Sequence, residues 1–502
     1  MAALLHSDLQ ATASATPERV ALRAGDDTWT FADLDAASNA FARYLASQGV
    51  GARDRVALMC SNRPEFFVVV QAVSRLGGAC VLISPAWKEK EIAHAIALTG
   101  PVAGVADGDG LRMLRTHLKA LSDLDEFDTL VAGMDRSALD VAAPLETDES
   151  VLVFSSGTTG LPKAARHTHR SLSIATAHWC AALGLTAEDR FQIATPPSHI
   201  LGLLNLLAAA SAGVTVRLHM RFDLDEVLRR IGEERMTLEM AVAPIALAMA
   251  NHPDLESFDL SSLRYIMWGA TPVTESVAQR VTDRTGVRWL PAYGASELPV
   301  LACNPVNDPA NWRLDSAGLP PAGVELRIVD LDSGEVLPSG EVGEIQARSE
   351  SVMAGYLPDS ASAEVFDDGW YRTGDVGWLE PQGWVHLTDR SKEMVKVNGF
   401  QVAPAELEAV LHGHPAVLDC AVFGIADERT GEAPVAAVQL DPSIAVADGE
   451  LQELVAKSLA TYKQLRHVVV VETIPRLPSG KVLRRALRDE WAPRLTASSA
   501  SA

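Results

Sequence analysis

The chain has 502 residues, of which 48% are hydrophobic and 22% charged, a composition typical of a globular protein with room for several domains. The formal net charge of −22 argues against nucleic-acid binding, and no apolar run reaches the roughly 18 residues that span a bilayer. The first residues lack a basic segment followed by an apolar core, so we expect no secretory signal. Five scattered cysteines favour reduced thiols and a cytoplasmic location.

Residues 1 to about 150 alternate between helical and strand patterns. Leu34 to Leu45 and Glu65 to Leu76 have helical periodicity, whereas Arg55 to Cys60 and Cys80 to Ile83 are typical of buried strands. This alternation predicts parallel sheets covered by helices on both faces, which is the α/β class.

A loop rich in glycine and hydroxyl side chains follows the apolar run Val151–Phe154. Its glycines allow tight bends, and its hydroxyls, backbone N–H groups and lysine can face one anion, as in a phosphate-binding loop. The spacing differs from the common P-loop pattern, and similar clusters occur in ordinary loops, so the loop by itself leaves both interpretations open. The residues are Ser155, Ser156, Gly157, Thr158, Thr159, Gly160 and Lys163.

The next segments suggest a helix and a pocket wall. Ser171 is expected to cap a helix after the loop. His199 lies in a segment bracketed by prolines and a glycine, and the apolar Ile200, Leu201 and Leu203 beside it suggest the wall of a pocket. A lone histidine is more often structural, so the histidine alone decides nothing.

Polar residues then follow strand-like runs, where ligands bind in α/β sheets. The run Leu263–Trp268 ends at Gly269, and Tyr293–Glu297 combines an aromatic ring, a glycine, a hydroxyl and a carboxylate that could stack a base and hold a cation. Asp375, just past a glycine turn, suits the two hydroxyls of a ribose. The turn-rich segment 318–378 predicts a β-rich subdomain.

The remaining residues predict a small separate domain. Residues 388–393 are the candidate boundary, Met394–Val402 alternates like a hairpin, and Pro404 to Leu411 reads as a helix started by proline. A stiff loop carrying Lys481 follows near the end of the chain.

Five segments resemble, in order and spacing, the adenylate-forming superfamily, which contains acyl- and aryl-CoA synthetases, peptide-synthetase adenylation domains and firefly luciferase. The resemblance implies a large N-terminal domain, residues 1–390, with two flavodoxin-like αβα subdomains and a distorted β-barrel. It also implies a small mobile α+β domain, residues 391–502, with a hinge near Lys392. The segments are Ser155–Lys163, Tyr293–Glu297, Tyr371–Asp375, Asp389–Val402 and Pro475–Lys481.

The same resemblance implies a site for ATP and Mg²⁺. The glycine-rich loop and Lys163 would hold the β- and γ-phosphates, while Thr158 and Glu297 would bind the metal. The rest of the nucleotide would contact Gly269, Ala270, Thr271, Tyr293, Gly294, Ser296, Asp375 and Arg390.

Catalytic roles also follow from the resemblance. Lys481 would reach the substrate carboxylate and the α-phosphate, and a domain rotation would then present the segment around Gly399 to a thiol. Lys396 and Gln401 match functional positions of plant-type aryl-CoA ligases, and His199 matches a residue that gates thiol entry. The acid pocket would be lined by Ile200, Leu203, Val242, Pro244, Trp268 and Val300.

The expected function is therefore acid–CoA ligation through an acyl-adenylate, with ATP, Mg²⁺ and coenzyme A. Because Trp268 should shorten the pocket, we expect an aromatic or medium-chain acid. The alternative acceptor is a carrier-protein thiol or an amine, as in amide synthetases. A nucleotide-binding regulator is disfavoured, because Lys481, Glu297 and Asp375 are all present. We expect a monomer or homodimer.

Overall fold

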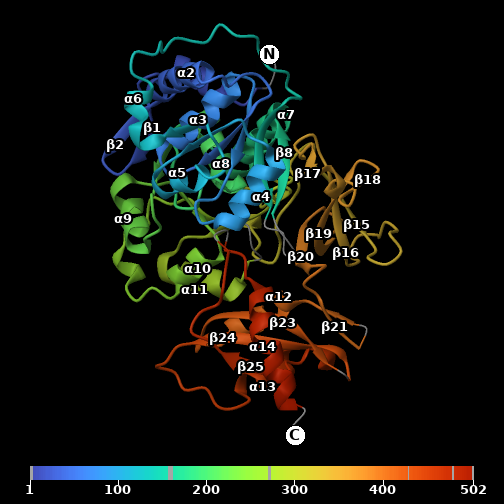
Figure 1. The fold of residues 1–502 in the computed structure, drawn as a ribbon. Helices are drawn as coiled ribbons and strands as arrows, with labels where there is room; N and C mark the ends of the chain where they lie inside the picture. Colours follow the sequence, from blue (N-terminus) through green and yellow to red (C-terminus); the bar gives the residue numbers. More distant parts are fainter. Residues whose placement is uncertain are drawn as a thin grey trace.

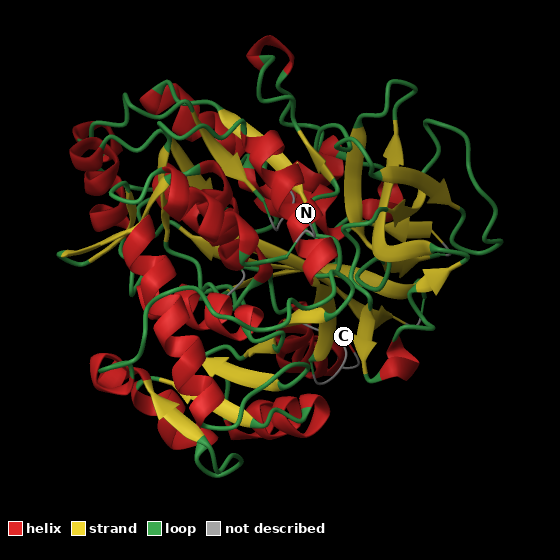
Figure 2. Ribbon diagram, turned by 90° about the horizontal axis from the view of Figure 1, so that it is seen from above, coloured by secondary structure: helices red, strands yellow, loops and turns green. Residues whose placement is uncertain are grey.

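The computed structural model describes residues 4–155, 162–269, 273–398, 400–427, 429–477 and 480–499. Figure 1 shows a large N-terminal domain above a smaller C-terminal domain. Seen from above, helices surround the sheets of the large domain and a strand-rich part lies to one side (Figure 2). In the described part of the chain, no helix is long and apolar enough to cross a membrane.

The first sheet of the large domain has seven strands in the order β17-β8-β7-β4-β3-β5-β6. The strands from β7 to β6 in that order are parallel, whereas β8 and β17 continue the sheet antiparallel at one edge. The expected buried strands are confirmed as β3 and β4. The bounds are β3 (Arg55–Met59), β4 (Ala79–Leu82), β5 (Ala103–Ala106), β6 (Leu121–Asp123), β7 (Glu149–Ser155), β8 (Lys163–Thr168) and β17 (Gly355–Leu357).

Helices pack beside this sheet, as the alternating pattern predicts. The expected helices are confirmed as α2 and α3, which bury their apolar faces in one core with β3 and β4. The capping box of Thr30 and Asp33 begins α2, and Pro64 occupies the first turn of α3. The bounds are α1 (Ser7–Ala15), α2 (Phe31–Ser47), α3 (Pro64–Arg75), α4 (Glu89–Thr99), α5 (Gly108–Leu114) and α6 (Phe127–Leu130).

A second layer consists of two four-stranded sheets, β2-β1-β10-β9 and β11-β12-β13-β14. The edge strands β9 and β11 are joined by one backbone hydrogen bond. The Thr237 N–H donates to the Arg190 carbonyl at 2.8 Å. β11, β12 and β13 run parallel, so their carboxyl ends meet at one edge. The bounds are β1 (Val20–Ala24), β2 (Asp27–Thr30), β9 (Arg190–Ile193), β10 (Thr215–Leu218), β11 (Leu238–Ala241), β12 (Tyr265–Trp268), β13 (Trp289–Tyr293) and β14 (Ala302–Cys303).

The helices of the second layer include one whose start differs from the prediction. Thr168, not Ser171, is the N-cap of α7, because its side chain accepts from the Ser171 N–H while Ser171 completes the capping box three residues later. The bounds are α7 (His169–Leu183), α8 (Ile200–Ala212), α9 (Leu224–Glu234), α10 (Ala243–Ala250) and α11 (Glu275–Thr285).

The β-rich segment forms a curled sheet in the order β15-β16-β19-β18, with β20 paired to β19. It corresponds to the barrel expected for the large domain, and together with the two layered units it gives the expected architecture. β19 and β20 bring Asp375 opposite Arg390. The bounds are β15 (Glu325–Val329), β16 (Gly343–Arg348), β18 (Phe366–Asp367), β19 (Trp370–Leu379) and β20 (Val385–Arg390).

The small domain has a mixed sheet in the order β22-β21-β24-β23, with β25 parallel to β24. The expected hairpin is β21–β22, and Pro404 begins α12 as predicted. The bounds are β21 (Val395–Val397), β22 (Phe400–Val402), β23 (Val417–Asp427), β24 (Gly431–Leu440), β25 (His467–Val470), α12 (Pro404–His412), α13 (Glu450–Ser458) and α14 (Arg484–Ser499).

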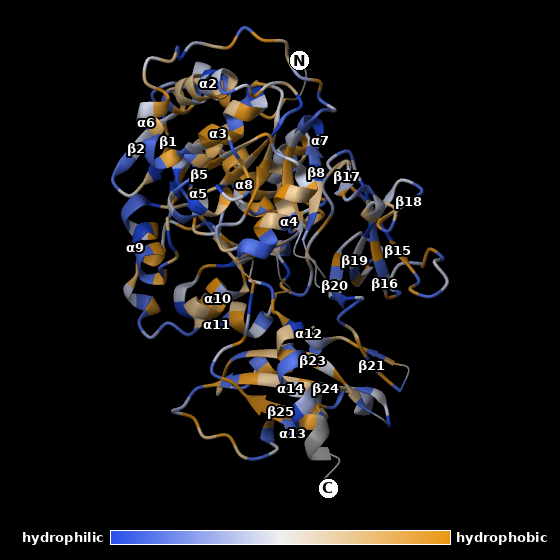
Figure 3. Ribbon diagram, viewed as in Figure 1, coloured by the Kyte–Doolittle hydropathy of each residue, from blue (hydrophilic) through white to orange (hydrophobic). Residues whose placement is uncertain are grey.

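Hydrophobic residues concentrate inside each domain rather than at its surface (Figure 3). α3 and α8 are apolar around most of their circumference and are almost wholly buried, whereas α9 shows polar residues outward. The small domain has its own cores on the two faces of its sheet. Each domain therefore has a hydrophobic core of its own, and polar side chains are left to meet between them.

Candidate active site

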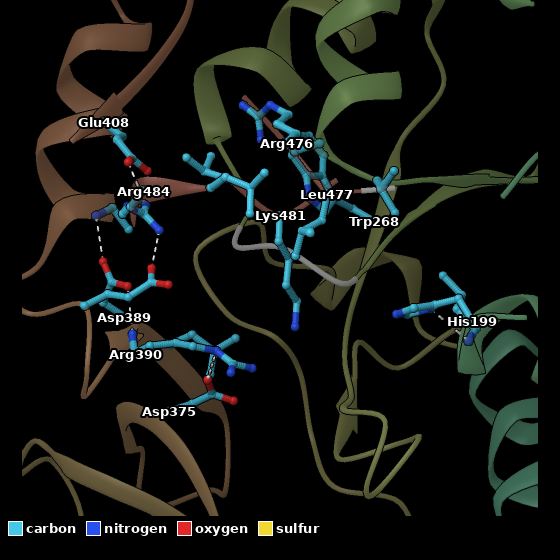
Figure 4. A pocket seen from close by; sticks show the side chains of 18 of the residues that line it. His199, Trp268, Asp375, Asp389, Arg390, Glu408, Arg476, Leu477, Lys481 and Arg484 are labelled. Carbon is cyan, nitrogen blue, oxygen red and sulfur yellow. Dashed lines mark hydrogen bonds and ion pairs between the residues drawn. The ribbon is translucent and has the colours of Figure 1, made fainter. Parts of the chain in front are cut away.

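A cavity of about 930 Å³ lies between the two domains. Val242, Trp268 and Tyr293 line it from the carboxyl ends of β11, β12 and β13, where parallel sheets commonly bind ligands. The C-terminal domain supplies the opposite wall, including Lys481 and Arg484 (Figure 4). The cavity thus joins segments that are widely separated in the sequence.

The residues expected to bind the nucleoside are connected to one another by a hydrogen bond and an ion pair. The Tyr293 hydroxyl donates to Asp375 Oδ2 at 2.6 Å, and Arg390 Nε lies 3.0 Å from Asp375 Oδ1. The Asp375 charge raises the pKa of Arg390, so this ion pair persists at any physiological pH. A buried aromatic ring beside a fixed carboxylate suits a base and the hydroxyls of its ribose.

Glycine is required at position 294 by a close backbone approach. A Cβ there would lie 2.0 Å from the carbonyl oxygen of Pro299, because the loop between β13 and β14 folds back on itself. The Ala295 N–H donates to the Leu298 carbonyl at 2.9 Å and closes this turn. His167 Nε2 donates to the Ser296 carbonyl at 2.7 Å and ties the same loop to β8. The loop that carries Ser296 is therefore held in place by bonds on two sides.

Glu297 is the carboxylate expected to bind Mg²⁺, and it is only 7% exposed. Tyr356 donates its hydroxyl to Oε1 of this carboxylate. No group of three or more metal-type side chains exists within the described residues, yet Mg²⁺ ordinarily takes one or two carboxylates together with substrate phosphates and water. A single buried carboxylate beside the nucleotide site fits that chemistry. Thr158, the other expected ligand, lies outside the described residues.

The structure describes only the two ends of the expected phosphate-binding loop. Ser155 closes β7, and Lys163 opens β8 directly opposite it. Lys163 Nζ lies 3.1 Å from the exposed Glu364 and 5.5 Å from the centre of the Tyr356 ring. Ser156, Gly157, Thr158, Thr159 and Gly160 lie outside the described residues, as do Ala270 and Thr271. Gly269 is described and donates its N–H to the Ala241 carbonyl at 3.2 Å.

Lys481 extends from the small domain into the cavity, between Arg390 and His199 (Figure 4). Loss of hydration, reinforced by the charge of Arg390, lowers its pKa to about 8. Gly480 packs so closely on the large domain that a Cβ would lie 2.9 Å from Pro244, and its φ of +85° also favours glycine. The lysine is thus seated between the domains by a loop that contacts both.

His199 is the N-cap of α8, and its Nδ1 accepts from the Leu201 N–H at 3.4 Å. Burial, reinforced by the positive charge of Lys481, lowers the pKa of the imidazole to about 4. The ring is therefore neutral at physiological pH, with Nδ1 held by the helix and the other nitrogen toward the cavity that it lines.

The apolar part of the cavity includes only some of the expected residues. Val242 and Trp268 line it, whereas Ile200, Leu203 and Val300 pack into the hydrophobic core. Pro244, also expected in the pocket, is not among the lining residues and instead lies against Gly480. The ring of Trp268 packs 5.0 Å from that of Trp289, centre to centre, which fixes this wall. Leu201, which the sequence suggested as part of a pocket wall, also lines it. Further lining residues that the sequence did not indicate are Ala243, Leu247, Val273, Thr274 and Ala292.

The expected hinge residue and the two residues expected to act after domain rotation lie away from the cavity. Lys392, Lys396 and Gln401 are exposed, and Lys396 pairs with Gln401 across the β21–β22 hairpin. Gly399, expected in the thiol tunnel, lies outside the described residues. In this structure the small domain therefore presents Lys481, and not the hairpin, to the cavity.

Charged groups that the sequence did not single out support the lysine loop. Arg484, three residues after Lys481, binds Glu408 at 2.7 Å and also pairs with Glu393. Arg476 forms a bidentate pair with Asp419 and donates to the Gly480 carbonyl at 2.9 Å. Their acidic partners Glu393, Glu408 and Asp419 lie at least 57 residues away in the chain, so no local pattern could have indicated these ion pairs.

The comparisons with known proteins agree with this geometry. A family model described as "AMP-binding enzyme" matches residues 9–357, and "AMP-binding enzyme C-terminal domain" matches residues 406–481. A 4-coumarate–CoA ligase of Oryza sativa subsp. japonica is 36% identical over 487 residues, covering 93% of this chain and 90% of that protein.

Two solved structures share the fold. The first is an anthranilate CoA ligase in complex with anthranoyl-AMP, with a TM-score of 0.92, 24% identity and 98% of each chain covered. The second is the o-succinylbenzoate CoA synthetase of Bacillus subtilis with ATP and magnesium ion. Its TM-score is 0.84 at 30% identity, and the match covers 96% of this chain and 99% of that one. With both family models matched in order over most of its length, the chain belongs to the AMP-binding enzymes of the adenylate-forming superfamily.

Proposed function

We propose that this protein, an AMP-forming acid–CoA ligase, activates a small aromatic carboxylic acid with ATP and transfers the acyl group to coenzyme A. The observation that carries the proposal is the convergence of Lys481 with Tyr293, Asp375 and Arg390 on one cavity between the domains. The aromatic preference is supported by the short apolar wall that Trp268 forms, and by the relatives named for aromatic acids.

The first half-reaction joins two anions, so its demand is electrostatic. A carboxylate oxygen of the acid attacks the α-phosphorus of ATP, and the phosphorus–oxygen bond to pyrophosphate breaks. Lys481, protonated at neutral pH, neutralises charge on the acid and the α-phosphate, while Arg390 and Asp375 fix the nucleoside. Mg²⁺, bound through Glu297 and the phosphates, would neutralise the departing pyrophosphate.

The second half-reaction requires a different group at the same site. The coenzyme A thiol attacks the acyl carbon, a carbon–sulfur bond forms, AMP leaves with the shared oxygen, and the thiol proton passes to solvent. We propose that residues 391–502 rotate about a hinge at Lys392, which withdraws Lys481 and brings Lys396, Gln401 and the segment around Gly399 to the cavity. Neutral His199 would then guide the thiol past the acid pocket.

The cellular setting belongs to the same proposal. All five cysteines are free thiols, and four of them are buried, which supports a reducing, cytoplasmic location. We expect a monomer or homodimer, since each chain carries both walls of its cavity.

A pyrophosphate-release assay over a panel of acids tests the proposal. The panel contains 4-coumarate, anthranilate, benzoate, octanoate and acetate, each with ATP and Mg²⁺ and without coenzyme A. We expect an aromatic acid to give the highest kcat/KM; preference for octanoate or acetate would refute the aromatic assignment. Adding coenzyme A, a carrier protein or an amine, followed by product mass, then identifies the acceptor. We expect the coenzyme A thioester, and an amide as the sole product would contradict it.

A further inference from the structure

Tyr356 contacts two residues expected in the nucleotide site, Glu297 and Lys163, although nothing above gives it a role in the reaction. Its hydroxyl donates to Oε1 of Glu297, and the face of its ring lies 5.5 Å from Nζ of Lys163. The phenol is the donor in this contact and the carboxylate oxygen is the acceptor.

The backbone around Tyr356 is fixed on both sides. β17 pairs with β8, so that Tyr356 lies opposite Ala165, two residues after Lys163. The Tyr356 N–H donates to Ser362 Oγ at 2.8 Å. Gly355 before it has a φ of +143°, and a Cβ there would lie 2.8 Å from the same Ser362 oxygen. The ring is 6% exposed and cannot reorient without disturbing its core.

Glu297 is held from the same segment by its backbone as well. The Met353 N–H donates to the Glu297 carbonyl at 2.8 Å, while the Tyr356 hydroxyl occupies Oε1. The second carboxylate oxygen has no hydrogen-bond partner among the described residues and remains available to a ligand. A carboxylate held at one oxygen by a neutral donor presents its other oxygen in a fixed orientation, which is what a metal ligand needs.

We propose that Tyr356 is a positioning residue that orients the Glu297 carboxylate to receive Mg²⁺–ATP, an inference that rests on the metal-binding role proposed for Glu297. The ring also gives the Lys163 ammonium group a face to lie against. A tyrosine that merely filled the core would need its ring and not its hydroxyl, so removal of the oxygen alone separates the two roles.

Equilibrium ATP binding by titration calorimetry, without acid and at increasing MgCl₂, tests the inference without turnover. Tyr356→Phe should raise the Mg²⁺ concentration for half-maximal enhancement of ATP binding about tenfold, the lower end of the loss seen when a partner of a metal ligand is removed. ATP affinity without Mg²⁺ should stay unchanged. Tyr265→Phe is the matched control. The buried hydroxyl of Tyr265 donates to the Leu183 carbonyl at 2.5 Å, and Tyr265 begins β12, whereas the other end of that strand lines the cavity.

Glu297→Gln separates failure of this inference from failure of the proposed function. If Glu297→Gln weakens the Mg²⁺ effect and Tyr356→Phe does not, Tyr356 has no positioning role, although the proposed function stands. If Glu297→Gln also behaves as the native protein, the metal-binding role of Glu297 itself is wrong. Equal loss of ATP binding with and without Mg²⁺ in Tyr356→Phe, with a lowered melting temperature, would assign the hydroxyl to stability and overturn the inference.

Discussion

At the scale of single residues, Lys481 has a pKa that the site itself sets. Loss of hydration is the main cause of the lowering to about 8, and Arg390 adds to it, while Asp375 and Glu297 act in the opposite direction. The group is protonated below this pH and becomes neutral above it. The charge that the proposed adenylation role needs is therefore lost within the alkaline range accessible to experiment.

This predicts the pH dependence of adenylation. kcat/KM for pyrophosphate release should fall tenfold per pH unit above about pH 8, because this parameter reports the pKa of the free enzyme. Lys481→Arg should lower the activity but remove the alkaline fall, since a guanidinium stays protonated. An unchanged alkaline limb in Lys481→Arg would show that another group titrates there.

Glu239 illustrates a residue whose ionisation opposes folding. It is 1% exposed on β11, accepts from Gln192 Nε2 at 2.7 Å, and burial raises its pKa to about 8. In the unfolded chain the pKa returns to its ordinary value near 4.5. Between these two values the unfolded chain releases the proton while the folded protein keeps it, so stability falls as pH rises through that window.

Glu239→Gln should therefore stabilise the protein at pH 7. The gain should be about 1–3 kcal/mol, since each unit of pKa difference corresponds to roughly 1.4 kcal/mol and structural relaxation reduces the sum. Chemical denaturation at pH 7 and at pH 5 measures it, and the advantage should shrink at pH 5. A constant difference at both pH values would contradict the linkage.

At the scale of elements, β20 and α12 are tied across the expected hinge. Asp389 at the end of β20 accepts from the Ala405 N–H at 2.9 Å, in the first turn of α12. A carboxylate at a helix N-terminus is favoured by the helix dipole. Burial nevertheless raises the pKa of Asp389 to about 6, so it is mostly ionised at pH 7. Asp389 precedes Lys392 in the chain and Ala405 follows it, so a rotation at Lys392 would separate the carboxylate from the N–H group.

Asp389→Ala should therefore favour the rotated arrangement. We expect the adenylation rate to fall about tenfold relative to thioester formation from supplied acyl-adenylate, since a hydrogen bond to a charged group contributes about 1.5–3 kcal/mol. Asp427→Ala is the control, because Asp427 caps a turn within the small domain by accepting from the Thr430 N–H at 3.0 Å. Equal losses in both half-reactions would show that Asp389 supports the fold rather than one arrangement.

At the scale of the whole molecule, the proposed mechanism makes the arrangement of the two domains decide which half-reaction the cavity supports. Lys481 belongs to the small domain and yet lines a cavity whose other wall comes from β11, β12 and β13. Arg476 and Arg484 hold its loop from within the small domain, so the lysine should move with that domain as one unit. In the proposed mechanism, this is the arrangement that supports adenylation.

Lys481→Ala should therefore separate the two half-reactions. Pyrophosphate release should fall about 10²–10³-fold, the usual effect of losing one preorganised charge, while supplied acyl-adenylate is still converted with coenzyme A. Lys457→Ala is the control, since Lys457 pairs on the surface of the small domain with Glu453. Equal loss of both half-reactions would count against the role given to the lysine.

The sequence by itself determined the features that depend on local chemistry. Apolar periodicity predicted α2, α3, β3 and β4, and Pro404 predicted the start of α12. The resemblance was equally local, since each of its five segments is a short run of residues, and it gave the architecture and the reaction class. The error at Ser171 was also local, because the capping box of α7 contains two hydroxyls, and only φ and ψ show which one precedes the helix.

Only the tertiary structure decided which side chains face the cavity. Leu201 lines it whereas its neighbours Ile200 and Leu203 are buried in the core, because the rotation of α8 about its axis is set by packing against other elements. The Tyr356–Glu297 and Arg484–Glu408 contacts likewise join segments far apart in the chain. Local patterns fix what an element is, but which faces of distant elements meet depends on the packing of the whole chain.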